Sequence, residues 1–357
     1  MSATRFAVIG GGFRSNYFLR IARALPSLFT CTGMVVRNPE KARAFGETWG
    51  VPVHPDLDAL LASSRPDFVV LSVTKEAFPA LLAELSRANL PVLCETPPAP
   101  TLEGLLDIWR LVEAGARIQV AEQHGLQPLN RARIAVARSG LLGAVSHVQL
   151  GSTHDYHATG LLRQLLGIDF EPVCITAREF TAPVMRGPGR AGPPGEPAID
   201  PETQVLAWLD YAGKLGVYDF TAGQPRSWIR ADRVLIRGER GELCGDELRY
   251  MKDYKTSVRL DLQRIDTGRG NSPESYYHRG VMAGDQWLYE NPYAGAPLGD
   301  DEIAGATMLQ RMAAYAAGGP EAYSFATAAQ DQYLALAITE AVARGEPVTT
   351  TVQPWAS

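Results

Sequence analysis

The feature that most constrains the fold of this chain is a glycine-rich turn close to its N-terminus. A short apolar run, Arg-Phe-Ala-Val-Ile, ends at Ile9, three glycines follow, and an apolar helical stretch covers residues 17–25. The pattern Gly10-x-Gly12-x-x-Ser15 is close to the GxGxxG fingerprint, whose first glycine permits a tight turn and whose second lets the backbone approach a pyrophosphate. Ser15 stands in place of the third glycine and is small enough for helix and strand to pack. The alternative is a glycine turn that binds no ligand.

Strand-like and helix-like segments alternate through the first third of the chain. Apolar runs typical of strands lie at residues 29–36, 67–73, 91–94 and 117–121, with helical patterns between them at residues 39–48, 76–88 and 101–114. This alternation predicts an α/β fold with a doubly wound parallel sheet. Such sheets bind ligands at the C-terminal ends of their strands, so the glycine turn is predicted to lie in a nucleotide site.

The end of the second predicted strand bears on the choice of cofactor. An acidic residue about 20 positions past the glycines would bind the ribose 2′-hydroxyl of NAD. This chain has Val36 and Arg37 there instead. Because a guanidinium can bind a 2′-phosphate through two hydrogen bonds, NADP is favoured, with NAD as the second possibility. The alternative is a solvated arginine in a loop.

Composition excludes several classes of protein. The chain has 357 residues, of which 46% are apolar and 20% charged, and this is enough for two cores. A net charge of −5 offers no basic excess for nucleic acid. No run approaches the roughly 18 apolar residues of a membrane span. The four cysteines show no CxxC pair, and no signal segment precedes the first strand, so we expect a cytoplasmic protein.

The second half of the chain has a different pattern. Strand-like runs recur at residues 145–153, 173–178, 204–210, 215–220, 233–236 and 257–263. They predict an α+β domain with an antiparallel sheet, one face of which is covered. We place the nucleotide-binding domain at residues 1–125 and a substrate-binding and oligomerisation domain at residues 126–357. Residues 183–200 hold five prolines and four glycines and are predicted to form a mobile loop or lid, and residues 291–301 are predicted to be irregular.

Several segments, in order, resemble the Gfo/Idh/MocA family, named for glucose–fructose oxidoreductase and inositol dehydrogenase. The run around Cys94-Glu95-Thr96-Pro97 resembles the family signature VLCEKP. Residues 151–167 resemble the segment DxGxHxxDLLRxLLG, and the family's closing helix is matched by YSFATAAQDQYLALAITEAVARGEPV. The resemblance implies an N-terminal Rossmann domain, a C-terminal domain with a large, mostly antiparallel open sheet, and homodimers or homotetramers formed through that sheet. The closing helix, at about residues 326–344, is expected to pack back on the first domain.

The resemblance also implies an NAD(P)-dependent oxidoreductase acting on sugars or cyclitols. The residues expected to contact the cofactor lie in the glycine turn and at strand ends: Gly10, Gly12, Phe13, Arg14, Ser15, Arg37, Ser72, Thr74, Glu95 and Pro97. Three family positions differ in this chain. Thr96 replaces the lysine that polarises the reacting oxygen, and Thr153 replaces an aspartate, while a later aspartate position is Gly160. A threonine hydroxyl brings no positive charge to a developing alkoxide.

The candidate catalytic residues are His157, Thr96, His124, Asp155 and His154. Histidine as a residue type ordinarily titrates near neutrality, so any of the three could move a proton, and His157 falls on the family's catalytic histidine. The alternatives are structural histidines and, for Asp155, an N-cap of a helix beginning near residue 158. No metal is expected, although His154-Asp155-x-His157 has spacing compatible with zinc.

Two further residues near these candidates have alternatives of their own. Tyr156 is a second possible acid, but aromatic residues in such turns more often line a pocket. Lys75 could supply the cation that Thr96 lacks, or could be a solvated loop lysine.

The sequence therefore predicts an NADP-dependent oxidoreductase that transfers hydride to or from a sugar-like or other small carbonyl or imine substrate. We include imines among the candidate substrates because imine reductases related to the family also lack the lysine. The alternatives are a non-redox enzyme that retains its nucleotide during elimination or glycoside cleavage, and a non-catalytic NADP-binding regulator. No nucleic acid or membrane partner is expected.

Overall fold

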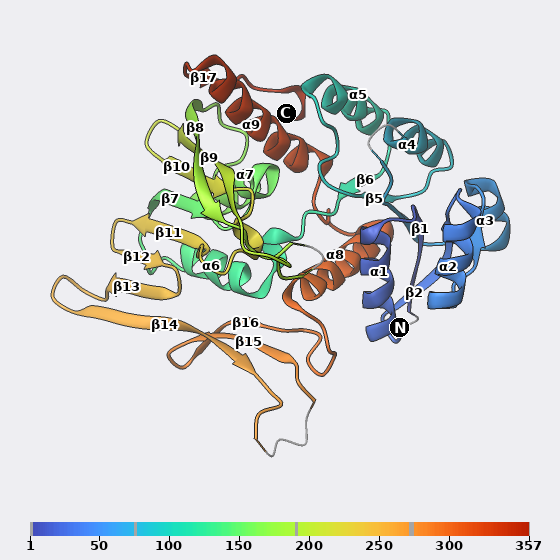
Figure 1. Cartoon of the computed structure of the whole chain (residues 1–357), viewed down its shortest axis with the longest axis horizontal. Coiled ribbons are helices and arrows are strands. Elements are labelled where there is room, and N and C mark those ends of the chain that lie inside the picture. The colour runs from blue at the N-terminus through green and yellow to red at the C-terminus, as the bar shows by residue number, and fades with distance from the viewer. Residues whose placement is uncertain (1–2, 75–76, 190–191, 271–274, 357) are drawn as a thin grey trace. The chain divides into compact units, whose positions relative to one another are not determined.

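The computed structural model describes residues 3–74, 77–189, 192–270 and 275–356 (Figure 1). The chain forms two compact units. Unit 1 contains residues 1–128, 266–279 and 291–329, and unit 2 contains residues 129–265, 280–290 and 330–357. The division expected from the sequence is contiguous, whereas each of these units is assembled from three separate segments of the chain.

Unit 1 is built around a six-stranded parallel sheet in the order β3-β2-β1-β4-β5-β6. Its strands are β1 (Thr4–Ile9), β2 (Phe29–Val35), β3 (Val53–His54), β4 (Phe68–Leu71), β5 (Val92–Cys94) and β6 (Ile118–Val120). The helices that connect them are α1 (Phe13–Ala24), α2 (Pro39–Trp49), α3 (Leu57–Ser63), α4 (Phe78–Arg87) and α5 (Leu102–Glu113). The strand order is that of a Rossmann fold, so the predicted doubly wound sheet is confirmed.

The central strands of this sheet are covered on both faces. In β4 all four residues are fully buried, and in β1 the last four are at most 2% exposed. The rings of Phe6 and Phe68 stack between neighbouring strands with centroids 6.0 Å apart. Continuous burial of this kind explains why these strands are recognisable in the sequence as apolar runs without alternation.

Two helices of unit 1 were not predicted, the short α3 and a longer helix near the end of the chain. Residues that follow the large sheet in the chain form α8 (Asp300–Ala316), which packs against α1 of the parallel sheet (Figure 1). The expectation that residues 291–301 are irregular is therefore wrong for Asp300 and Asp301, which begin this helix. Three acidic residues in the first turn of α8 stabilise its N-terminal end through the helix dipole.

Unit 2 is built around an eleven-stranded sheet in the order β16-β15-β14-β13-β12-β11-β7-β10-β9-β8-β17. Its strands are β7 (Val145–Gly151), β8 (Cys174–Met185), β9 (Ile199–Asp210), β10 (Leu215–Thr221), β11 (Arg233–Gly238), β12 (Gly241–Cys244), β13 (Glu247–Met251), β14 (Ser257–Asp266), β15 (His278–Ala283), β16 (Gln286–Glu290) and β17 (Val348–Thr349). Among the pairings recorded between described strands, only β7 with β10 is parallel. The predicted large, mostly antiparallel sheet is confirmed.

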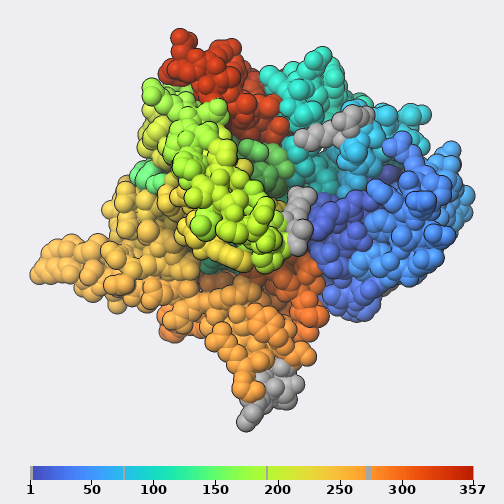
Figure 2. All heavy atoms as spheres, viewed as in Figure 1, coloured from blue at the N-terminus to red at the C-terminus, as the bar shows by residue number. Residues whose placement is uncertain are grey.

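One face of the large sheet carries the core of unit 2. Apolar side chains from α6 (Pro128–Arg138), α7 (Asp155–Leu166) and α9 (Phe325–Arg344) pack against strand residues in a single buried cluster. Away from this core, Phe180 and Trp208 are 48% and 42% exposed. The turn between β13 and β14 projects from the surface, where Tyr254 is 85% exposed (Figure 2). The sheet thus has a packed face and exposed apolar side chains, as an open sheet does.

Fewer residues of the proline- and glycine-rich segment 183–200 lie in a loop than the sequence predicts. Strands β8 and β9 continue into it from both sides, with Pro183 opposite Pro201 and Met185 opposite Ile199. Arg186 and Asp200 close the ladder with two hydrogen bonds of 2.7 and 3.1 Å. The prediction of a mobile loop across all of residues 183–200 is therefore wrong at both ends, because prolines were treated as incompatible with a strand that tolerates them near a hairpin end. Residues 190 and 191 lie outside the described residues.

The last long helix begins in unit 1 and continues in unit 2. Its first residue, Phe325, stacks on Trp109 of α5 with ring centroids 6.4 Å apart. No helix formed by the described residues combines the length and the apolar character that a membrane crossing requires.

Candidate nucleotide site and histidine cluster

The glycine turn of unit 1 has a backbone that a side chain would disrupt. Gly10 has φ = 131°, and a Cβ placed on it would lie 1.9 Å from the carbonyl oxygen of Ser72, which follows β4. Around Gly12 a Cβ would meet no atom within 4 Å. The first glycine therefore lets two strand ends approach each other, and the second leaves open space beside the start of α1. This is the arrangement that a pyrophosphate site needs.

Ser15 fulfils the role of the missing third glycine. Its side chain is fully buried, and its hydroxyl donates a hydrogen bond of 3.0 Å to the carbonyl oxygen of Gly10. The serine therefore fits between helix and strand and also ties the helix to the turn that precedes it. The departure from the fingerprint has a local structural explanation.

The N-terminal end of α1 is able to receive an anion. Gly12 occupies the N-cap position, no side chain caps the helix there, and the first turn contains no acidic residue. Phe13 follows with a side chain that is 65% exposed. Since uncapped N–H groups and the helix dipole both favour negative charge, this end suits the phosphates of a dinucleotide.

The end of β2 has an apolar residue followed by an exposed arginine. Val36 is 6% exposed, and its Cγ1 lies 3.0 Å from where a Cβ on Gly11 would be. An apolar side chain therefore packs where an NAD-binding protein would present a carboxylate. Arg37 is exposed next to it, and Asn38 caps α2 by accepting a hydrogen bond of 2.9 Å from the backbone of Lys41.

Arg14 and Glu95, both expected to contact the cofactor, bind each other. Arg14 Nε donates to Glu95 Oε1 over 3.0 Å, and its Nη1 lies 3.4 Å from Asp301 Oδ2 of α8. Burial raises the pKa of Glu95, although Arg14 opposes that rise. Burial also opposes the charge on Arg14, but the carboxylates of Glu95 and Asp301 raise the pKa of its guanidinium overall. Sequence reasoning missed Asp301, because it treated its segment as a loop.

The other residues predicted for unit 1 lie at the C-terminal ends of its strands. Ser72 follows β4 and donates its backbone N–H to Ile9 over 2.8 Å. Thr74 is exposed beyond it, while Thr96 and Pro97 are half-buried after β5. His124 begins a short 3₁₀ turn (His124–Leu126) after β6 and donates its backbone N–H to the Glu122 carboxylate over 2.9 Å. Lys75 lies outside the described residues.

The second group of candidates forms an aromatic cluster at the start of α7 in unit 2. The imidazole rings of His154 and His157 meet edge to face with centroids 5.0 Å apart. Tyr156 lies 4.2 Å from His157, and Phe220 of β10 lies 5.9 Å from His154, measured between ring centroids. The His157 side chain is largely buried, with 6% of the residue exposed. The structure thus brings together the two histidines that the sequence places three residues apart.

Asp155 begins α7 instead of preceding it. The helix starts at Asp155 with His154 at the N-cap position, three residues earlier than the capping hypothesis for Asp155 assumed. Asp155 has φ = 45°, a left-handed conformation that aspartate tolerates, and its carboxylate lies 3.2 Å from His154 Nδ1. Its backbone N–H donates to the Tyr218 hydroxyl over 3.3 Å, and burial raises the pKa of that hydroxyl.

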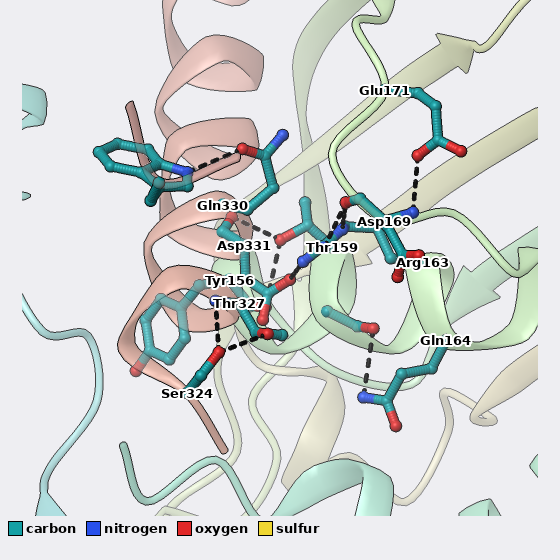
Figure 3. Close-up of polar contacts among 12 residues, drawn as sticks. Tyr156, Thr159, Arg163, Gln164, Asp169, Glu171, Ser324, Thr327, Gln330 and Asp331 are labelled. Carbon is teal, nitrogen blue, oxygen red and sulfur yellow. Dashed lines mark hydrogen bonds and ion pairs between the residues drawn. The ribbon is translucent and has the colours of Figure 1, made fainter. Parts of the chain in front are cut away.

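A buried ion pair anchors α7 (Figure 3). Arg163 is paired through Nη1 with Asp331 of α9, and both side chains are at most 5% exposed. Arg163 Nε also donates to the Asp169 carbonyl over 2.7 Å, and the Thr159 hydroxyl donates to the Asp331 carbonyl over 2.7 Å. Sequence reasoning missed this network. An arginine and an aspartate inside two otherwise apolar helical patterns were the available signal.

The structure gives the two altered aspartate positions of the family pattern different surroundings. Thr153 is 3% exposed, and its hydroxyl makes no hydrogen bond within the described part of the chain. Gly160 lies buried inside α7. No set of three or more His, Cys, Asp or Glu side chains among the described residues is arranged to hold a metal ion.

Comparison with known proteins agrees with the fold and the glycine turn. Residues 4–122 match the model of the Gfo/Idh/MocA family, described as an oxidoreductase family with an NAD-binding Rossmann fold. The match covers the nucleotide-binding part of this chain, which is therefore similar to the Rossmann domain of that oxidoreductase family. No curated protein sequence matches the chain.

Three solved structures show the same fold across almost the whole chain. An oxidoreductase from Agrobacterium radiobacter, in complex with NAD+, L-tartaric acid and magnesium, is 19% identical with a TM-score of 0.69, covering 97% of this chain and 98% of the other. A levoglucosan dehydrogenase with NADH and L-sorbose is 18% identical with a TM-score of 0.69, covering 99% and 100%. The WlbA dehydrogenase from Bordetella pertussis, with NADH and UDP-GlcNAcA, is 17% identical with a TM-score of 0.65, covering 99% of each chain.

Proposed function

We propose that this protein is a cytoplasmic, NADP-dependent oxidoreductase that transfers hydride to or from a sugar-like or other small carbonyl or imine substrate. The observation that carries the proposal is the glycine turn, with its open space at Gly12 and the uncapped start of α1. When bound, the nicotinamide supplies the hydride chemistry, and the protein supplies binding, orientation and electrostatics. Gly10, Gly12 and Ser15 fit the pyrophosphate-binding turn, and Ser72, Thr74 and Pro97 would line the same strand ends.

The preference for NADP is supported by the end of β2. Val36 offers an apolar side chain where a carboxylate would bind a 2′-hydroxyl, and the exposed Arg37 offers two N–H donors for a 2′-phosphate. The three structures above contain NAD+ or NADH, so the proposed preference for NADP rests on Val36 and Arg37 of this chain alone.

For the proton we propose His157 as the general acid or base. Its buried imidazole lies against His154 and Tyr156, so its orientation is restricted. Proton transfer to a positioned substrate requires a donor or acceptor of restricted orientation, and histidine is the side chain that most often has this role. His154 and Asp155 would orient the cluster, and Thr96 and His124 would hydrogen-bond the reacting oxygen or nitrogen.

Thr96 supports a substrate that needs no fixed cation. An alkoxide is stabilised by a neighbouring ammonium, whereas a C=N group accepts a proton more readily than a carbonyl does, and one hydroxyl donor can orient it. Because carbonyl reduction and alcohol oxidation share the same alkoxide-like transition state, this argument favours imine reduction among the candidate reactions. The exposed apolar residues of the large sheet, among them Trp208, are proposed to mediate formation of a homodimer or homotetramer.

Calorimetric titration of the purified protein with NADP+ and, separately, with NAD+ tests the nucleotide assignment. We expect NADP+ to bind at least tenfold more tightly, since a charge-assisted bond to the 2′-phosphate contributes about 1.5–3 kcal/mol. Tighter binding of NAD+ would overturn the cofactor preference. Binding of neither would overturn the proposed function.

A further inference from the structure

Helix α8 contributes a residue to the nucleotide site from far along the chain. Arg14, in the first turn of α1, is paired with Glu95 after β5 over 3.0 Å and with Asp301 in the first turn of α8 over 3.4 Å. Its guanidinium also lies 3.9 Å from the centroid of the Tyr17 ring. An arginine so enclosed is held by the protein, because its donors are directed at two carboxylates and its face rests on a ring.

Asp301 connects three parts of the parallel sheet. Besides Arg14, its carboxylate accepts a hydrogen bond of 3.4 Å from Gln127, which follows β6, and its backbone carbonyl accepts one from the Tyr17 hydroxyl. Through Arg14 it also reaches Glu95. One residue of α8 thus fixes the segments that leave β1, β5 and β6 at the edge where a dinucleotide would bind.

The two helices approach too closely for this contact to adjust freely. A Cβ on Gly305 of α8 would lie 2.2 Å from the hydroxyl oxygen of Tyr17. The Arg14, Tyr17 and Asp301 contacts therefore set the direction of the first turn of α1, whose N–H groups would face the pyrophosphate.

We propose that Asp301 is a positioning residue for dinucleotide binding, acting through Arg14 on the N-terminal turn of α1. The inference rests on the proposed nucleotide site and adds to it a residue that no glycine fingerprint includes. It also assigns Arg14 a new role: it holds the helix that binds the phosphates, instead of binding a phosphate itself.

Electrostatics alone predicts the opposite effect of a substitution. Asp301 places a negative charge near an anion site, so its removal would tighten binding of an anionic ligand if charge were its whole effect. Positioning predicts weaker binding, because a misdirected helix end loses part of its interaction with the phosphates. The direction of the change in affinity therefore distinguishes the two.

The experiment compares Asp301→Asn with Glu302→Gln in NADP+ titrations of the full chain. Glu302 is the matched control, because it is the next residue, pairs with Arg20 of α1 over 2.7 Å, and has a side chain that is 21% exposed. We expect Asp301→Asn to raise the Kd by about tenfold with an unchanged melting temperature, and Glu302→Gln to change the Kd less than about twofold. An unchanged or lower Kd for Asp301→Asn, with wild-type binding intact, would overturn the inference alone. Absence of wild-type binding would instead overturn the proposed function.

A double-mutant cycle tests whether Arg14 transmits the effect. In an Arg14→Gln background, Asp301→Asn should weaken NADP+ binding by less than about twofold, because the pair it breaks is already gone. A full tenfold loss in that background would show that Asp301 acts by another route. If the Arg14 variant does not fold, the comparison with Glu302→Gln still decides the inference.

Discussion

The glycine turn of unit 1 and the histidine cluster of unit 2 are specified in different ways. In the turn, backbone geometry dominates. The positive φ of Gly10 and its close approach to Ser72 both require a glycine, and the Ser15 hydroxyl bonds the carbonyl of Gly10, five residues earlier. In the cluster, side-chain contacts dominate, and they depend on distant parts of the chain: Asp155 bonds Tyr218 across 63 residues, and the helix that carries the cluster is held by Arg163 and Asp331, 168 residues apart. A site formed by backbone geometry can therefore be recognised in a short stretch of sequence, whereas a site formed by side chains from distant parts of the chain cannot.

The largest effect is expected at the cluster. His157→Ala should lower kcat/KM by about 10²–10⁴-fold, the usual contribution of a general acid or base, and leave the Kd for NADP+ within twofold. Steady-state kinetics with direct nucleotide titration measures both. A folded variant that keeps a third or more of the wild-type activity would move His157 to a structural role and would leave the cluster without its proposed acid.

The anchor of the cluster should matter for stability. Asp331→Asn leaves Arg163 buried without its counter-ion, so the free energy of unfolding should fall by about 3–5 kcal/mol. Asp200→Asn is the control, since its pair with Arg186 is exposed and should not change the melting temperature measurably. Equal effects of the two substitutions in thermal unfolding would show that the buried pair does not hold α7.

The turn should respond to a cofactor-specific change. Arg37→Ala should weaken NADP+ binding by about tenfold or more and leave NAD+ within twofold, because only NADP+ carries the 2′-phosphate. Arg43→Ala is the control, because Arg43 pairs with Glu47 within α2 and both side chains are solvent-exposed. Equal losses for both nucleotides in the Arg37 variant would remove the basis for the NADP assignment.

Thiol reactivity offers a smaller test of how the two sheets differ. Cys94 lies buried in the parallel sheet, and burial raises the pKa of Cys31 to about 12. Cys174 and Cys244 are exposed on the large sheet. We expect two thiols to react quickly with a maleimide at pH 8 in the native protein and four after denaturation, with mass spectrometry identifying the sites. Fast native labelling of Cys94 would contradict the packing of β5.

Sequence reasoning succeeded where local pattern is sufficient. The strands of the parallel sheet are apolar runs buried on both faces, and the glycine turn lies between a strand and a helix as its spacing predicts. A helix was expected to begin near residue 158, within the segment that resembles the family pattern, and α7 begins three residues earlier, at Asp155. Element type follows from periodicity, whereas the first residue of a helix depends on local hydrogen bonds.

It failed where distant parts of the chain decide. Helix α8 was not predicted because the residues before it are rich in glycine and proline. Its first turn nevertheless contains Asp300, Asp301 and Glu302, and acidic residues of this kind are typical of a helix start. Because α8 was missed, Asp301 was missed as a second partner of Arg14 beside Glu95. The partner of Arg163 lies 168 residues away, a separation that no local spacing rule covers.

The most direct test of the central claim is the stoichiometry of NADPH consumption during turnover. The protein is incubated with NADPH and a panel of small sugars, ketones and cyclic imines, and absorbance at 340 nm is followed alongside product formation. The account predicts one NADPH oxidised for each product molecule formed, with the rate reduced to near background in His157→Ala. Product formation without a net absorbance change would show a recycled nucleotide, and tight NADPH binding with no turnover on any substrate would show a regulator. Either result would contradict the proposed oxidoreductase.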